Sequence, residues 1–256
     1  MLNNIKTIKY LINNYGFFNL LKKGFIYYKR KNIQVFQKTS SSYAGSLKLI
    51  KKNNFSNIEW NNIEFFENEH INKIAKNLSS LPANDKILIT EIGEKVLSNE
   101  YRFFSKISIN IDSINFNKDY LENIIWEKGM KLSKYSQFDK KYGDIKRVFE
   151  INRFQYLDAL IPYFYLTEGK KRKEITDYIA SFFDQWMHQN PYLKSVAWSC
   201  SQEISIRSIK LIFFFGFLKH GLIFKKSYVD YLFKAAKKVY EDIEYAVVQR
   251  NNHSIT

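Results

Sequence analysis

The regular spacing of apolar residues along the second half of this 256-residue chain is the feature that most restricts its fold. In "KKRKEITDYIASFFDQWMHQNP" (170–191), large apolar side chains recur three or four residues apart, at Ile175, Tyr178, Ile179, Phe182, Phe183 and Trp186. This spacing predicts one apolar face of an α-helix, which Asn190-Pro191 ends. The chain has only 9 glycines and 3 prolines, so long helices are favoured over a sheet with many tight turns.

The segments on either side of this helix have the same character. Helical spacing predicts further helices over 71–78, 91–101, 118–133, 148–169, 201–221 and 228–248. We expect Pro162 to kink the helix that contains it and Gly169 to cap its C-terminus. One short strand is expected where Ile107, Ile109 and Ile111 alternate with polar residues. Short connections predict antiparallel helical hairpins, so the fold class is mainly α, as a solenoid or a toroid.

The N-terminal third is more polar and less regular. Residues 1–38 are basic and partly amphipathic, and we expect a helix that packs on the main domain; binding to a membrane surface is the alternative. This stretch lacks the pattern of a secretory signal, and no segment has the roughly 18–20 apolar residues of a membrane span. We therefore expect an N-terminal helical and irregular region over 1–88 and a larger helical domain over 89–256.

The formal net charge of +15 indicates an anionic partner: nucleic acid, a membrane surface or an acidic polysaccharide. The lysines are dispersed and no nucleic-acid-binding motif is present, which argues against nucleic acid. The single cysteine, Cys200, excludes an internal disulfide framework and a zinc site of the paired-cysteine type. No histidine has the spacing of a metal ligand, so we expect neither a metal nor a cofactor.

Two charged pairs stand out on the predicted helices. Glu150 and Arg153 are three residues apart, and Glu203 and Arg207 are four apart, so each pair shares a helix face. Each pair can be a structural ion pair. In the functional interpretation, Trp198 is an aromatic platform beside an arginine that holds a sugar carboxylate through two hydrogen bonds. The stretch "NNH" (251–253) is either a tail or one wall of a site.

Several motifs in order point to a known family. They are "GDIKRVFEINRFQYLDALIPYFYLTEGKK", "WMHQNP", "VAWSCSQEISIRSIKLIFFFGFL" and "NNH", with "GEKVLSNEYRFFS" upstream. Together they cover roughly residues 90–253, and the series resembles the N-terminal helical domain of the heparinase II/III family of polysaccharide lyases. Phe149 stands where that family commonly has Trp.

The resemblance implies an incomplete α/α toroid and β-elimination on an acidic, uronate-containing polysaccharide such as a glycosaminoglycan. Asn252 and His253 match the family's carboxylate-neutralising pair, which meets the charge that develops on the uronate carboxylate. The predicted substrate-binding residues are Trp198, Glu203, Arg207, Glu150 and Arg153. The family's catalytic Tyr and a later His correspond to positions beyond these 256 residues, so we expect this chain alone to be inactive.

A second interpretation stays open. The chain can be a non-catalytic helical module that binds anionic glycan or protein partners in surface-polysaccharide metabolism. The compartment is also open, because the family resemblance implies the periplasm whereas the missing signal pattern favours the cytoplasm. The sequence does not choose the polysaccharide or the oligomeric state.

Overall fold

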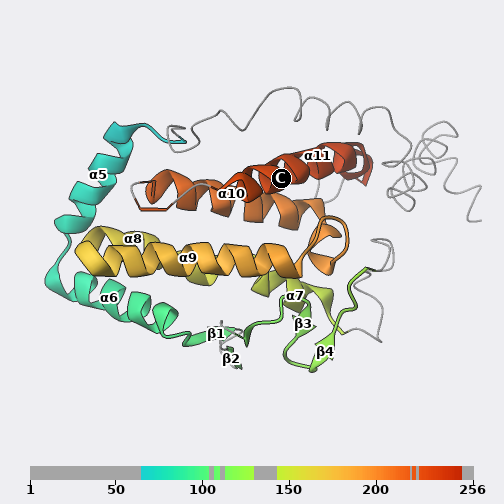
Figure 1. The fold of residues 1–256 in the computed structure, drawn as a ribbon, viewed down its shortest axis with the longest axis horizontal. Coiled ribbons are helices and arrows are strands. Elements are labelled where there is room, and N and C mark those ends of the chain that lie inside the picture. The colour runs from blue at the N-terminus through green and yellow to red at the C-terminus, as the bar shows by residue number, and fades with distance from the viewer. Residues whose placement is uncertain are drawn as a thin grey trace, which may run out of the picture. The chain divides into compact units, whose positions relative to one another are not determined.

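The computed structural model describes residues 65–103, 107–109, 113–129, 143–219, 221–222 and 225–249, and these residues are mainly helical (Figure 1). The predictions for the basic N-terminal helix and for the terminal "NNH" lie outside them. The density of internal contacts divides the chain into a unit of Phe55–Ala235 and a second unit of Met1–Asn54 with Ala236–Thr256. The predicted domain boundary at residue 88 stays a prediction.

The elements follow one another with short connections. The helices are α5 (Asn68–Ser79), α6 (Ala83–Leu97), α7 (Ile145–Ile151), α8 (Leu160–Leu166), α9 (Gly169–Gln189), α10 (Ser201–Phe217) and α11 (Lys226–Gln249), with 3-10 turns η5 (Gln155–Leu157) and η6 (Val196–Trp198). Strands β1 (Tyr101–Phe103) and β2 (Ile107–Ile109) form one antiparallel hairpin, and β3 (Lys118–Asp119) and β4 (Ile124–Ile125) form another. The strand expected from the alternating isoleucines is confirmed over Ile107–Ile109.

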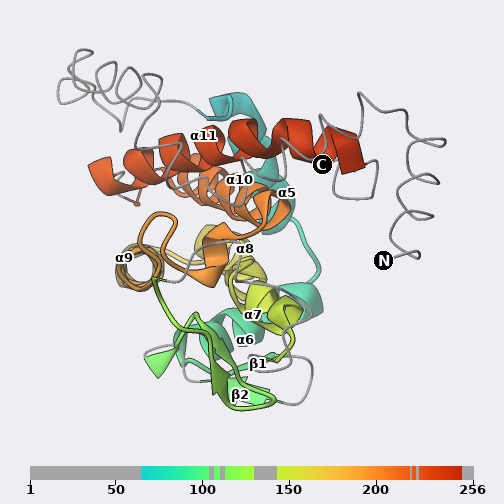
Figure 2. The ribbon, with the colours of Figure 1, turned by 90° about the vertical axis from the view of Figure 1, so that its right-hand side faces the viewer.

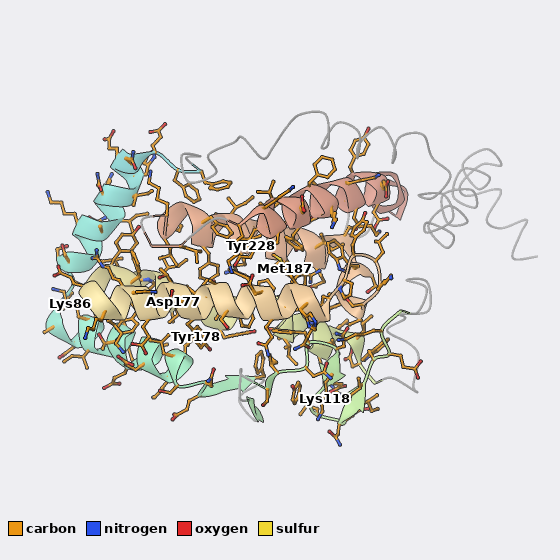
Figure 3. All side chains as sticks on the ribbon, in the orientation of Figure 1. Lys86, Lys118, Asp177, Tyr178, Met187 and Tyr228 are labelled. Carbon is orange, nitrogen blue, oxygen red and sulfur yellow. The ribbon has the colours of Figure 1, made fainter. Side chains whose placement is uncertain are left out.

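Helices α9, α10 and the first part of α11 are consecutive antiparallel neighbours. Phe183 of α9 contacts Phe214 and Phe215 of α10, while further along α9 Trp186 lies against Arg207, so the two helices run in opposite directions. Tyr228 of α11, labelled in Figure 3, donates a hydrogen bond to Asp184 of α9 at 3.1 Å. In Figures 1 and 2, α10 lies on one side of α9, and α6, α7 and the two hairpins lie on the other.

The core of the Phe55–Ala235 unit is aromatic. Phe154, which is 1% exposed, makes edge-to-face contacts with Phe182, Phe183 and Trp186, with ring centroids 5.3–5.5 Å apart. These three partners lie on the face of α9 that the spacing predicted, and the helix ends at Gln189 with Asn190 as its C-cap. The predicted helix over 170–191 is therefore confirmed.

The predicted helix over 118–133 is wrong, because residues 118–125 form the β3–β4 hairpin. The carboxylate of Asp119 accepts hydrogen bonds from the backbone N–H groups of Leu121 and Glu122, at 2.9 and 3.3 Å, and so fixes the turn. Asn123 has a positive φ of 58° at the return. A side chain that bonds the backbone two and three residues ahead competes with helix formation.

The single helix predicted over 148–169 is also wrong, since it is divided into α7, η5 and α8. Phe154 has a φ of 63°, a left-handed conformation that interrupts the helix and lets its ring enter the core. Pro162 lies in the first turn of α8, where its missing N–H costs no helical hydrogen bond. Gly169 begins α9, and the last carbonyls of α8 are instead bonded by the hydroxyl of Thr167 and the guanidinium of Arg172.

Helices α10 and α11 each have an exposed side as well as a buried one. On α10, Ile209 is 50% and Phe213 is 39% exposed. On α11, Tyr240 is 76% exposed, whereas Lys238 and Asp242 are buried and form an ion pair with each other.

Helices long and apolar enough to span a membrane are absent from the part of the chain that the structure describes.

Candidate functional site

Three of the four charged residues singled out in the sequence are joined by hydrogen bonds. Arg153, just after α7, donates from Nε and Nη2 to the carboxylate of Glu203 in the first turn of α10, at 2.8 and 2.7 Å. Its Nη1 donates to Glu150 at 2.7 Å. The guanidinium therefore lies between two carboxylates that are about fifty residues apart in the sequence. We call these three residues, together with Arg207 one turn after Glu203 on α10, the four-charge cluster.

Local structure explains why Arg153 reaches α10. Helix α7 begins at Asp144, whose side chain accepts from the backbone N–H of Lys146 at 2.9 Å, and ends at Ile151. Glu150 occupies its last turn, and Arg153 follows two residues after its end. Phe154 then turns the chain into the core through its positive φ. The helix end and this turn together let Arg153 reach Glu203 of α10 while it also bonds Glu150 of α7.

Exposure differs across the cluster. The side chain of Glu203 is 4% exposed, whereas those of Arg153 and Glu150 are 29% and 32% exposed. Hydrogen bonding to Glu203 raises the pKa of the Arg153 guanidinium above its usual range, so this group stays charged. A buried carboxylate is stable only when it is paired, and the two-bond contact with Arg153 provides the pair. Glu150 and Arg153 form the part of the cluster that solvent reaches.

Arg207, one turn after Glu203 on α10, is completely buried. Its Nη2 donates to the backbone carbonyl of Ala197, and its guanidinium carbon lies 5.3 Å from the ring centroid of Trp186. Among the described residues, its Nε and Nη1 have no hydrogen-bond acceptor. The ion pair that the Glu203–Arg207 spacing suggested is replaced by the pair of Glu203 with Arg153.

Trp198 is 2% exposed and so is not a platform open to solvent. Its Nε1 donates to the carbonyl of Asn190 at 3.0 Å, and its ring packs on Tyr192 and Tyr231 with centroids 4.9 and 5.5 Å away. Trp198 thus joins η6 to α11 and, through Asn190, to the end of α9. Its predicted contact with substrate stays a prediction.

The predicted catalytic residues Asn252 and His253 lie outside the described residues, so the structure does not relate them to the four-charge cluster. No group of three or more His, Cys, Asp or Glu side chains that could hold a metal ion occurs within residues 65–249 where they are described.

The sequence reasoning missed a second link beside the cluster. Lys210 of α10 forms an ion pair with Asp158, which follows η5. Lys210 comes seven residues, or two helical turns, after Glu203 and so lies on the same side of α10. The seven-residue spacing was the one sequence signal that placed Lys210 on the same side of the helix as Glu203. The two links attach the segment after α7 to one side of α10.

No protein-family model, curated protein or solved structure matches this chain.

Proposed function

We propose that this chain is the N-terminal part of a polysaccharide lyase that cleaves a uronate-containing acidic polysaccharide by β-elimination. In this proposal the antiparallel helices belong to an incomplete α/α toroid, and the four-charge cluster lies on the substrate side. The net charge of +15 supports a polyanionic substrate, because it attracts anions over a long range.

The observation that carries the proposal is the partly exposed guanidinium of Arg153 between two carboxylates. A guanidinium is the side chain best matched to a sugar carboxylate. Arg153 therefore offers the contact that the carboxylate of a uronate needs. Because Trp198 and Arg207 are buried, we assign direct contact with the uronate carboxylate to Arg153, and the support of Arg153 to Glu203.

The reaction needs more than binding. Removing the proton next to a uronate carboxylate places negative charge on that carboxylate, and preorganised donors must meet this charge. In the proposal, Asn252 and His253 supply these donors, whereas Arg153 binds the polymer. The group that removes the proton is assigned to no described residue.

The test is an elimination assay on alginate, polygalacturonate, hyaluronan and heparin. The readout is the near-ultraviolet absorbance of the unsaturated uronate product. We expect the 256-residue chain to bind at least one polymer without cleaving it. If the gene encodes residues beyond Thr256, the longer product should cleave that polymer and lose this activity with Asn252→Ala.

Two results would contradict the proposal. Binding without cleavage by the extended product would favour a non-catalytic module for anionic glycan. The absence of both binding and cleavage would remove the assignment to acidic polysaccharide altogether.

A further inference from the structure

The four-charge cluster contains two carboxylates and two guanidinium groups, so its formal charges cancel. The four groups are not held equally firmly. Glu203 is bound by two hydrogen bonds from Arg153 and is 4% exposed. Glu150 is bound by one, at 2.7 Å, and is 32% exposed. Because an exposed ion pair contributes little stability, Glu150 is the carboxylate that can leave at low cost.

The cluster without Glu150 has a net positive charge. Arg153 and Arg207 then supply two positive charges against the single negative charge of Glu203. The side chain of Arg207 is completely buried, so its formal positive charge lies inside the fold. Its Nε and Nη1 have no acceptor among the described residues, so no neighbouring carboxylate is bonded to it to neutralise it locally. Once Glu150 has left, Nη1 of Arg153 would therefore face solvent. It would lie in a positively charged, partly buried position that suits one carboxylate of a ligand.

We propose that Glu150 is an internal competitor that occupies, on Nη1 of Arg153, the position taken by the carboxylate of an acidic sugar. Arg207 is the positioning residue, since its buried charge keeps the receptor positive after Glu150 leaves. This inference rests on the proposed function for the identity of the ligand as a uronate.

The chain contains a natural control for this inference. Arg147 donates from Nη1 to Asp119 at 3.2 Å and to Glu122 at 2.6 Å. Asp119 is fully buried and Glu122 is 47% exposed, so this arginine also has one buried and one exposed carboxylate. The difference is that no unpaired buried guanidinium comparable to Arg207 accompanies it among the described residues. Without its exposed carboxylate this second set is neutral and should not attract an anion.

The experiment uses free glucuronate as the probe and glucose as the neutral comparison. Binding is measured by NMR titration of the arginine side-chain N–H signals, which show where the ligand binds. We expect Glu150→Ala to bind glucuronate roughly two- to fivefold more tightly than the unmodified chain, as removing a partly exposed ion pair implies. The affected signal should be that of Arg153. Glu122→Ala makes the same change in net charge and should leave the affinity unchanged.

Two further variants complete the test. Arg153→Met should abolish glucuronate binding, and Arg207→Met should weaken it even when Glu150 has been removed. Thermal unfolding shows whether the Arg207 variant is folded, and the Glu150 and Glu122 comparison does not depend on it. An equal gain from Glu150→Ala and Glu122→Ala, or no binding of glucuronate to Glu150→Ala, would overturn the inference. If glucuronate binds selectively but neither the 256-residue chain nor a longer product cleaves a polysaccharide, the proposed lyase function is contradicted and the role of Glu150 is not.

Discussion

At the scale of single residues, Gly93 is the position where adding a single methyl group should clash most directly with a buried side chain. A Cβ atom there would lie 2.3 Å from Cδ1 of Tyr163, whose ring is buried between α6 and α8. Gly to Ala inside a helix is normally favourable by about 1 kcal/mol, whereas overpacking costs about 1–3 kcal/mol. We expect steric repulsion to prevail and Gly93→Ala to lower the free energy of unfolding by up to about 2 kcal/mol.

Chemical denaturation of Gly93→Ala beside Thr90→Ala checks this expectation. Thr90 is an exposed position on the same helix, so its replacement should change stability little. Increased stability of the Gly93 variant would show that Tyr163 moves aside at small cost.

The carboxylate of Glu94 makes stability depend on pH. Tyr163 donates a hydrogen bond to it, and Lys171 lies 3.1 Å away. The hydrogen bond from Tyr163, followed by that from Lys171, lowers the pKa of Glu94 below its usual 4.5. Burial and the hydrogen bond to Glu94 raise the pKa of Tyr163 to about 12, so its hydroxyl remains a donor at neutral pH.

Because the folded pKa of Glu94 is the lower one, its contribution is fully present above pH 4.5 and is lost as the pH falls through the folded pKa. We therefore expect the chain to be more stable than Glu94→Gln at pH 7 and this difference to shrink below pH 4.5. Urea unfolding across this range measures it, with Glu91→Gln as a control for the change of charge on the exposed face of α6. A difference that stays constant down to the acid limit would contradict the ionic origin.

At the scale of elements, Asn152 joins three parts of the fold. Its Nδ2 donates to the carbonyls of Phe116 and Val148 at 2.8 and 2.7 Å, and its Oδ1 accepts from Nε1 of Trp186 at 2.7 Å. Asn152 is completely buried, so Asn152→Ala leaves several buried polar groups without this partner. We expect a loss of about 3 kcal/mol in unfolding free energy.

A double-mutant cycle measures how much of that loss in unfolding free energy comes from the hydrogen bond between Asn152 and Trp186. Trp186→Phe removes the N–H that Asn152→Ala would leave unbonded. The double variant should therefore lose less than the sum of the two single variants, by about 1 kcal/mol. Denaturant unfolding of the four proteins gives the coupling energy. Strict additivity would show that the Trp186 N–H finds another acceptor.

Spacing predicted those helices whose apolar face packs along their whole length. Helix α9 is of this kind, and its buried residues follow its predicted face. The failures occur where a local interaction opposes helix formation: the side chain of Asp119 bonds the backbone of the next residues, and Phe154 adopts a positive φ. Neither effect has a periodic signal, because each depends on where one side chain lies in three dimensions.

Part of the candidate site was likewise predictable from the sequence. The Glu150–Arg153 pair follows from a spacing of three residues and is confirmed at 2.7 Å. The contact of Arg153 with Glu203 connects segments about fifty residues apart and depends on the break after α7. A sequence that predicts one continuous helix over 148–169 cannot predict that contact. The burial of Trp198 and Arg207 likewise depends on how η6 packs on α9 and α11.

At the scale of the whole molecule, the net charge and the four-charge cluster should affect binding differently. The charge of +15 acts on any polyanion over a distance, and salt screens it with a Debye length of about 10 Å at 0.1 M. The cluster acts on one carboxylate by direct hydrogen bonding at a partly buried arginine, where screening is weaker.

Salt titration separates these two contributions. We expect the affinity for alginate to fall at least about tenfold between ~0.05 and ~0.5 M NaCl, because long-range attraction is lost. The affinity of Glu150→Ala for glucuronate should fall much less over the same range. Isothermal titration with both ligands measures the two slopes, and dextran serves as an uncharged polymer. Equal slopes would mean that glucuronate is held by the general field of the protein and not by Arg153. An alginate affinity that does not change with salt would show that the large net charge has no part in recognising the polymer.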